Sequence, residues 1–180
     1  MLMSAHSSCL LVIDVQERLA PVMTDPRRVI RNCGLLMRAA RRLGVPTLLS
    51  EQYPKGLGPT VPDLRELMPE GGSLAKLHFA ASADPEIAAR LAETERQQMV
   101  LAGIELHVCV QQSALELKAS GREVFVVRDA CASRRAEDER LAEERLRQAG
   151  VGVVSVEMVL FEWLRIAGRA EFKELSALIR

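Results

Sequence analysis

Three side chains in the sequence are suited to nucleophilic catalysis. Asp14 follows the apolar run CLLVI (9–13), Lys76 lies within SLAKLHF (73–79), and Cys109 comes soon after the apolar run MVLA (99–102). A thiolate can attack a carbonyl carbon, a neighbouring carboxylate can take the thiol proton, and an ammonium group can stabilise both anions. Together, these groups would suffice for acyl transfer through a thioester.

Cys109 is the candidate nucleophile. The run 99–102 has the length and character of a buried parallel strand, and Gly103 interrupts it. Apolar residues then recur at helical spacing, and Gly121 stands where helices often end. The pattern predicts strand, tight turn and helix, with Cys109 at the helix start, where unpaired amides and the helix dipole favour a thiolate. The alternative is that Cys109 only packs as a small apolar residue.

The other two side chains also have simpler interpretations. Asp14 could cap a turn instead of acting in catalysis. Lys76, between Ala75 and Leu77, could extend its ammonium group to water. However, parallel strands place their carboxyl ends along one edge of a sheet, so Asp14, Lys76 and Cys109 can meet there. Because three residue types with complementary chemistry fall at such positions, we expect a catalytic site at that edge.

Strands and helices alternate along the sequence, which predicts βαβ units and a parallel sheet. Asp25-Pro26 and Asp84-Pro85 are typical helix starts, with an acid at the N-cap and proline at the first helical position. The expected strands span 9–13, 45–50, 99–102, 123–129 and 151–156, and 73–79 is a short mixed segment that contains Lys76. We expect Asp129 to order the turn 130–133 and Ser133 to cap the helix 136–149. One domain spanning residues 1–180 is predicted.

Composition and simple motifs narrow the range of possible functions. The chain holds 24 basic and 24 acidic residues, so no net positive charge favours a nucleic-acid partner. It contains no apolar run of about 20 residues that would predict a membrane span, and the N-terminus does not resemble a signal peptide. There is no glycine-rich nucleotide motif, so no cofactor is expected. The four cysteines form no CxxC pair, which indicates a reduced, cytoplasmic protein.

The motifs resemble those of the isochorismatase-like cysteine hydrolase superfamily, which includes nicotinamidases and N-carbamoylsarcosine amidases. The matching segments are LLVIDVQ around Asp14, AKLHFAA around Lys76, GIELHVCV around Cys109, and VVRDACASR. EQYPKGLG and FKELSALI resemble the isochorismatase-domain-containing subgroup in particular. The resemblance covers nearly the whole chain. It implies a doubly wound α/β/α sandwich with about six mainly parallel strands, and an Asp14-Lys76-Cys109 triad.

The resemblance also implies details of the site. A cis peptide bond would lie at Ile104-Glu105, and the backbone amides of Glu105 and Cys109 would form an oxyanion hole. Nicotinamidases carry an aspartate and histidines after the second strand to bind a metal, whereas this chain has SEQYP (50–54). We therefore expect a site without metal. Candidate pocket residues are Gln16, Leu19, Tyr53, Phe79 and His107.

Three functions remain open at this point. The first is hydrolysis of a small amide or related C–N bond, which retention of Cys109 favours. The second is hydrolysis of a vinyl ether, as in isochorismatases, with Asp14 as the acid. The third is a protein without turnover, in which Cys109 senses oxidants or the surface serves assembly. A small-molecule substrate and a homo-oligomer are the expected partners.

Overall fold

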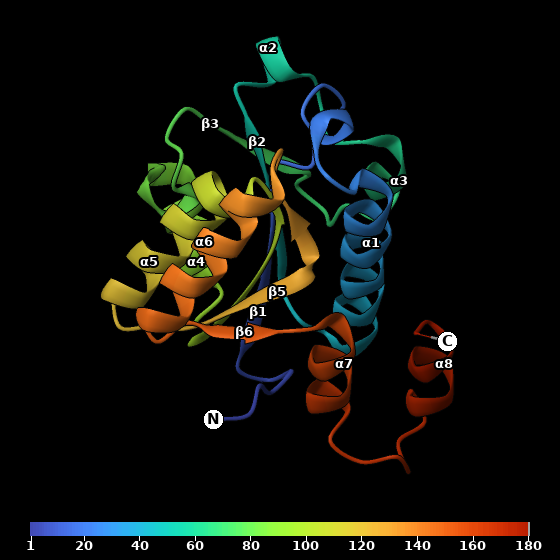
Figure 1. Cartoon of the computed structure of the whole chain (residues 1–180). Helices are drawn as coiled ribbons and strands as arrows, with labels where there is room; N and C mark the ends of the chain where they lie inside the picture. Colours follow the sequence, from blue (N-terminus) through green and yellow to red (C-terminus); the bar gives the residue numbers. More distant parts are fainter. Residues whose placement is uncertain (180) are drawn as a thin grey trace.

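The computed structural model describes residues 1–179 of the 180-residue chain. Six strands form one parallel sheet in the order β3-β2-β1-β4-β5-β6 (Figure 1), which confirms the predicted sheet. The strands are β1 Ser8–Ile13, β2 Thr47–Gln52, β3 Ser73–Lys76, β4 Gln98–Ile104, β5 Glu123–Ala132 and β6 Gly152–Val154. The two edge strands, β3 and β6, are also the shortest, with 4 and 3 residues.

Helices cover both faces of the sheet, as Figure 1 shows, so the predicted three-layer sandwich is confirmed. Helices α1 (Pro26–Leu43), α3 (Pro62–Arg65), α7 (Val156–Leu164) and α8 (Phe172–Ala177) pack on one face. Helices α4 (Pro85–Glu93), α5 (Gln111–Ala119) and α6 (Ala136–Gln148) pack on the other. The short helix α2 (Pro54–Leu57) follows β2, and 3-10 turns lie at Ala20–Val22 and Ala81–Ala83. Within residues 1–179, no helix has the length and apolar character needed to cross a bilayer.

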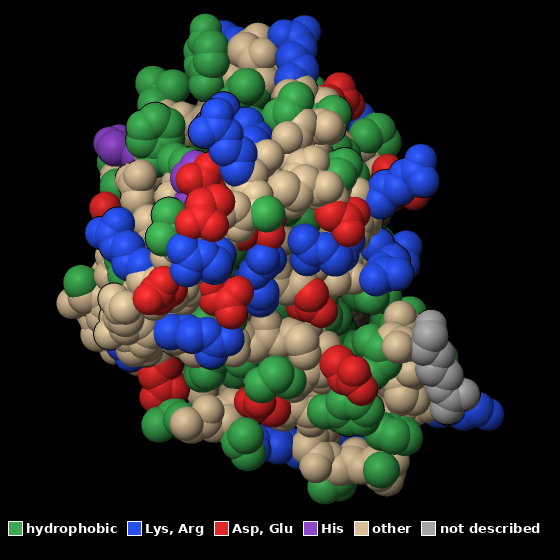
Figure 2. Space-filling view, in the orientation of Figure 1, with side chains coloured by type: hydrophobic (Ala, Val, Ile, Leu, Met, Phe, Trp, Pro, Cys, Tyr) green, Lys and Arg blue, Asp and Glu red, His purple; other side chains and the backbone are tan. Residues whose placement is uncertain are grey.

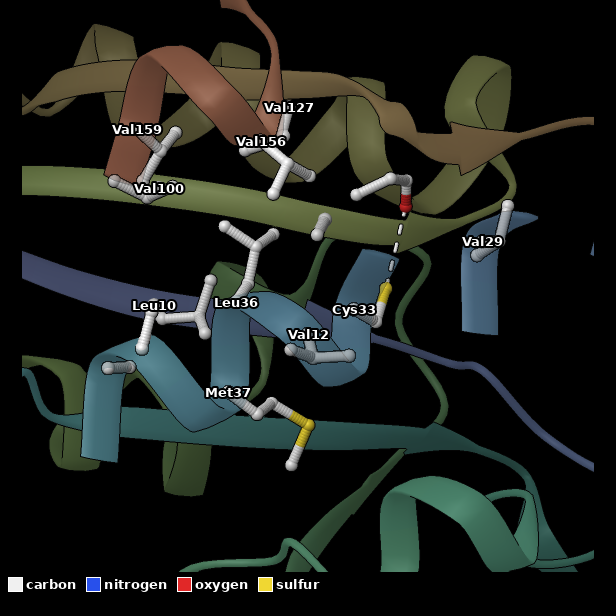
Figure 3. Close-up of a cluster of buried hydrophobic side chains, with 14 of the residues drawn as sticks. Leu10, Val12, Val29, Cys33, Leu36, Met37, Val100, Val127, Val156 and Val159 are labelled. Carbon is white, nitrogen blue, oxygen red and sulfur yellow. Dashed lines mark hydrogen bonds between the residues drawn. The ribbon is translucent and has the colours of Figure 1, made fainter. Parts of the chain in front are cut away.

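Burial on both faces explains why the central strands are continuous apolar runs. Side chains alternate along β1, so Leu10 and Val12 join the core beneath α1, while Leu11 and Ile13 join the core beneath α4 and α5. Figure 3 shows the first of these cores, in which Leu36 of α1 lies against the sheet. The helices are thereby fixed to a rigid sheet that can hold side chains at its carboxyl edge.

The predicted Asp-Pro helix starts are confirmed. The Asp25 carboxylate accepts a hydrogen bond from the Arg28 backbone N at 3.1 Å, at the start of α1. At the start of α4, the Asp84 carboxylate accepts from the Glu86 N at 3.1 Å and the Ile87 N at 3.5 Å. Each acid therefore satisfies amides that the helix leaves unpaired.

Most strand boundaries differ by a few residues from the sequence prediction, and two of these differences affect the site. Strand β2 ends at Gln52 instead of residue 50, because its pairing with β1 and then β3 continues past the apolar residues. Strand β5 continues to Ala132 instead of ending at Asp129. Its register with β4 breaks between Leu101 and Gly103 and then resumes, so that Cys131 lies opposite Gly103 and Ala132 lies opposite Ile104. A bulge of this kind re-aims the residues that follow it.

The predicted roles of Ser133 and Asp129 are wrong. Residue Arg135, not Ser133, stands at the N-cap of α6, and no side chain caps that helix. Asp129 does not order the turn, because it lies within β5 and its carboxylate accepts from the Val156 N at the start of α7, at 2.9 Å. Pairing of β5 with β4 as far as Ala132 places Ser133 beside the turn after β4 instead.

Charged side chains on the α6 face form local ion pairs. Figure 2 shows basic and acidic side chains interspersed over this part of the surface. On α6, Arg140 pairs with Glu137 at 2.8 Å and Glu144 at 3.4 Å, and Arg147 pairs with Glu143 at 3.0 Å. Side chains of opposite charge therefore lie beside one another on this face.

The direction of chain winding reverses between β1 and β4. The chain runs outward from β1 through β2 to β3, then crosses back through α4 to β4 on the other side of β1. In open parallel sheets, ligands bind at the carboxyl ends of strands beside such a reversal. Asp14 and the turn that carries Cys109 follow directly after these two strands.

Candidate active site

The Asp14 carboxylate and the Lys76 ammonium form a fully buried ion pair. Lys76 Nζ lies 2.7 Å from Asp14 Oδ2, and both side chains are 0% exposed. The hydroxyl of Ser50, on β2, donates to Asp14 Oδ1 at 2.7 Å. Asp14 itself has a φ of 54°, a left-handed conformation that non-glycine residues seldom adopt. The backbone therefore turns sharply just where the carboxylate is presented.

Lys76 is held by further oxygen atoms. Its Nζ donates to Gln52 Oε1 at 2.6 Å and to the backbone carbonyls of His78 at 3.1 Å and Phe79 at 3.2 Å. Ser50 and Gln52 were not identified from the sequence as site residues, because a serine and a glutamine near a strand end resemble ordinary polar strand termini. Their position at the carboxyl end of a parallel strand is the signal that could have revealed them.

Burial raises the pKa of Asp14, which is the largest influence on this group. The charge of Lys76, and hydrogen bonds from Lys76 and Ser50, oppose that rise by stabilising the carboxylate. The net direction is upward from the ordinary aspartate value of 3.8. A carboxylate with a raised pKa holds a proton more readily, which suits a group that must accept and return one.

Cys109 lies in a π-helical turn, Leu106–Val110, directly before α5. Turns of this kind occur often at functional sites. The charges of Asp14 and Lys76 both act on the Cys109 thiol, which therefore lies close to these two groups. The structure therefore brings together the three residues whose types suggested catalysis.

The expectation that the Cys109 thiol ionises readily is wrong. Burial, and next the negative charge of Asp14, raise the pKa of Cys109 to about 12. The charge of Lys76 opposes this rise but does not outweigh it. The thiol is therefore protonated at neutral pH, and Asp14 is the adjacent group that can remove the proton.

The remaining cysteines lie elsewhere in the core. All four cysteines are free thiols within residues 1–179. Cys9, Cys33 and Cys131 are 0% exposed, whereas Cys109 is 5% exposed. Cys33 donates to the Ala130 carbonyl at 3.5 Å, a contact drawn in Figure 3. Burial raises the pKa of each of these three thiols, so Cys109 is distinguished by its exposure and its neighbours.

The turn before Cys109 begins with a cis peptide bond between Ile104 and Glu105, which confirms that expectation. The Glu105 carboxylate accepts from the Arg134 N at 3.2 Å and from Arg134 Nε at 3.0 Å. On the other side of the turn, the Ser113 hydroxyl donates to the Cys109 carbonyl at 2.7 Å and accepts from the Ala81 N at 2.7 Å.

Gly103 allows the turn to approach the strand that carries Asp14. Its φ is +119°, and a Cβ at this position would lie 2.1 Å from the Ile13 carbonyl oxygen. Only glycine avoids that overlap and accepts this conformation. The close approach of β4 to β1 therefore depends on the missing side chain.

The candidate pocket residues occupy different environments. Tyr53 and Phe79 are 52% and 55% exposed, while Leu19 and His107 are half-buried. Gln16 is fully buried. Its amide nitrogen donates to the Gln52 carbonyl at 2.9 Å and the Gly58 carbonyl at 2.7 Å, and its oxygen accepts from the Gln52 N at 2.8 Å. The backbone engages both ends of the Gln16 amide, so this side chain anchors the loop after β2.

The side chains near Asp14, Lys76 and Cys109 include few metal-binding groups. Across residues 1–179, no three His, Cys, Asp or Glu side chains gather in a way that could hold a metal ion. The groups that face Lys76 and Asp14 from β2 are the hydroxyl of Ser50 and the amide of Gln52.

Comparison with known proteins agrees with this geometry. Residues 8–158 match the isochorismatase domain. The chain belongs to the isochorismatase family. Isochorismatase domain-containing protein 2 of Danio rerio is 37% identical over 98% of this chain and 89% of its own length. Membership of this family of hydrolases makes the chain a hydrolase, and its relatives place it in the isochorismatase-domain-containing subgroup.

Two solved structures share the whole fold. The MAR1 ribonuclease of Caenorhabditis elegans has a TM-score of 0.93 at 35% identity, covering 99% of this chain and 92% of that one. YcaC of Escherichia coli, described as an octameric hydrolase of unknown specificity, has a TM-score of 0.93 at 26% identity. The match to YcaC covers 99% of this chain and 89% of that one.

Proposed function

We propose that the protein is a cysteine hydrolase that cleaves a small amide or related C–N bond through a thioester on Cys109. The observation that carries this proposal is the buried Asp14–Lys76 ion pair beside the Cys109 thiol. A base, a cation and a nucleophile converge there at the carboxyl edge of the sheet. Acyl transfer by a thiol needs these three groups within contact distance.

Asp14 would move the protons in this reaction. As Cys109 Sγ attacks the substrate carbonyl carbon, Asp14 takes the thiol proton, so no free thiolate is needed beforehand. Asp14 then gives the proton to the leaving nitrogen as the C–N bond breaks and the thioester remains. Next it takes a proton from water, which attacks the thioester and releases the acid. The thiolate recovers that proton, while Lys76 stabilises each anionic state of the pair.

The backbone amides of Glu105 and Cys109 are proposed to bind the oxyanion. An oxyanion hole needs two donors aimed at one point. Residues 105 and 109 begin and nearly end the turn that carries the thiol. Their amides, and not the Glu105 carboxylate, would contact the reacting oxygen.

Vinyl-ether hydrolysis is the second candidate, and the raised pKa of Asp14 favours it. Such a reaction needs an acid that protonates carbon, and a buried carboxyl with an elevated pKa retains its proton to higher pH. In that reaction the thiol of Cys109 would be dispensable. Amide hydrolysis therefore requires the sulfur of Cys109, whereas vinyl-ether hydrolysis does not.

A substrate panel tests both candidates. Purified protein is incubated with small amides, ureides and isochorismate, and intact mass spectrometry follows the formation of an acyl adduct. We expect an adduct on Cys109 with an amide or ureide, and loss of turnover in Cys109→Ala and Asp14→Asn. Vinyl-ether cleavage that survives Cys109→Ala would select the second candidate instead. No turnover of any compound would favour a role in redox sensing or assembly.

Leu19, Tyr53, Phe79 and His107 are proposed to surround the substrate. Tyr53 lies at the start of α2, and Phe79 closely follows β3. His107 precedes the nucleophile on the same turn. Substitution of Phe79 by alanine should raise KM more than it lowers kcat, since Phe79 contributes a side chain only to binding.

We also propose a homo-oligomer in the cytoplasm. The octameric description of YcaC, which has the same fold, supports self-association. Four unpaired cysteines suit a reducing compartment. Sedimentation velocity at micromolar concentration would separate a monomer from higher assemblies.

A further inference from the structure

The segment after β5 lies against the turn that carries Cys109. Strand β5 rejoins β4 after its bulge, with Ala132 opposite Ile104. The next residues, Ser133 and Arg134, consequently reach Glu105 and His107. Neither residue takes part in the proposed reaction.

Ser133 binds the middle of the turn. It is 0% exposed, and its hydroxyl oxygen accepts from the His107 N at 3.3 Å. The same oxygen lies 2.8 Å from His107 Nδ1, so it contacts both the backbone and the ring. His107 is only two residues before the nucleophile, so its position constrains that of Cys109.

Ser133 is itself fixed from two other elements. Its backbone N donates to the Glu139 carboxylate of α6 at 2.9 Å, and its carbonyl accepts from the Thr24 N at 2.9 Å. Glu139 is buried and also pairs with Arg128. An anchor with this many partners can resist displacement, whereas an isolated hydroxyl could not.

Arg134 binds the beginning of the turn. Its backbone N and its guanidinium Nε both donate to Glu105 Oε2, at 3.2 and 3.0 Å. The guanidinium is largely exposed, with 60% of the side chain accessible, so it can be changed without opening the core. Two consecutive residues thus restrain two points of one short turn.

We propose that Ser133 and Arg134 are positioning residues that hold the turn 105–109 so that Cys109 faces Asp14. This inference rests on the proposed function, because it assigns the pair a purpose in that reaction. Neither side chain contacts the reacting atoms. Their effect passes through His107 and Glu105, and misplacement of a nucleophile by about 1 Å can cost on the order of a hundredfold in rate.

The test compares Ser133→Ala and Arg134→Gln with Ser155→Ala. Ser155 is a matched control, because its hydroxyl also accepts a backbone amide, that of Met158 at 3.2 Å, but it caps α7. The first measurement is the iodoacetamide reaction rate of Cys109 as a function of pH. It needs no substrate, so it remains informative even if the proposed hydrolysis fails.

We expect Ser133→Ala to shift the alkylation profile of Cys109 to lower pH. A thiol that moves away from Asp14 and Lys76 loses the effect of the carboxylate charge, which raises its pKa more than the ammonium charge lowers it. On an identified substrate, kcat should fall at least about tenfold while KM changes little. Arg134→Gln should show smaller changes of the same direction in the alkylation profile and in kcat. This variant still provides the test if Ser133→Ala does not fold. Ser155→Ala should match the wild type in both measurements.

Profiles and kcat values like those of the wild type in both Ser133→Ala and Arg134→Gln would overturn the proposal. So would equal changes in Ser155→Ala, because these would reflect general loss of stability. If no variant or wild-type protein hydrolyses any substrate but the alkylation profile still shifts, the proposed function fails and the positioning role stands.

Discussion

Ser50 contacts Asp14, the group that carries the proton in the proposed reaction. Its hydroxyl donates to Asp14 and so lowers the pKa of a carboxyl that burial raises. As a base, Asp14 is active above its pKa, and activity is lost as the pH falls through that value. Ser50→Ala removes a donor from the carboxylate and should raise the pKa further. The acidic limb of kcat/KM should therefore move to higher pH, as a pH–rate profile of both proteins would show. An unchanged limb would mean that another group controls it.

The reactivity of Cys109 should exceed that of the other thiols. Brief alkylation with iodoacetamide, followed by peptide mapping, should label Cys109 before Cys9, Cys33 and Cys131, since only Cys109 has measurable exposure. Equal labelling of all four would contradict its assignment as the nucleophile.

Asp14→Asn should make the Cys109 thiol more acidic while it stops hydrolysis. The negative charge of Asp14 is the second cause of the raised thiol pKa, after burial. Without that charge, the pH at which alkylation accelerates should fall. A rise in that pH would show that Lys76 had lost its place when the ion pair was broken, and would refute the stated cause.

Residue type and strand-end position were sufficient to select Asp14, Lys76 and Cys109 as candidates, because their chemistry is distinctive, and the structure places the three near one another. Ser50 and Gln52 were not identified, because a serine and a glutamine at a strand end resemble ordinary polar termini. Their function depends on contacts between strands, which sequence spacing does not reveal. The high pKa of Cys109 was likewise hidden, because it depends on burial and on Asp14 in three dimensions.

Among the structural elements, the junction of β1 and β4 depends most on one residue. Gly103→Ala would force a Cβ to within 2.1 Å of the Ile13 carbonyl oxygen. We expect the free energy of unfolding to fall by more than about 3 kcal/mol, as for other severe overlaps in a core. Urea denaturation measures this change.

Gly44→Ala provides the control for Gly103→Ala. Gly44 also has a positive φ, of 68°, but a Cβ there would meet nothing within 4 Å. Gly44→Ala should lower the free energy of unfolding only by the backbone strain, about 1–2 kcal/mol. Similar losses in the two variants would show that strain, and not contact with Ile13, decides the stability.

The regular elements could be predicted more fully than the irregular ones. Asp-Pro helix starts and apolar strand runs are local signals, and both were correctly placed. The bulge in β5 and the final position of Ser133 arise from pairing with β4. A local sequence pattern does not show which strand will pair with β5. The sequence therefore indicated that Ser133 caps a helix, whereas in the structure Ser133 is buried and binds the turn after β4.

At the scale of the whole molecule, we predict activity without a bound metal. Across residues 1–179, no suitable group of three ligands gathers, and hard or borderline metals need several converging oxygen or nitrogen donors. Dialysis against EDTA should leave kcat/KM and the melting temperature unchanged. Elemental analysis that finds one tightly bound metal per chain, with activity lost on its removal, would contradict this prediction.

The short strands at the two sides of the sheet also bear on solubility. Unpaired strand edges can recruit strands from other chains and start aggregation. Here the outermost strands offer only 4 and 3 residues for such pairing. The long apolar strands, which would be the most dangerous templates, lie in the interior of the sheet, where both of their edges are largely occupied. Partial unfolding that detached β3 or β6 would therefore expose the edges of β2 or β5, which are longer and more prone to aggregation than the native edges.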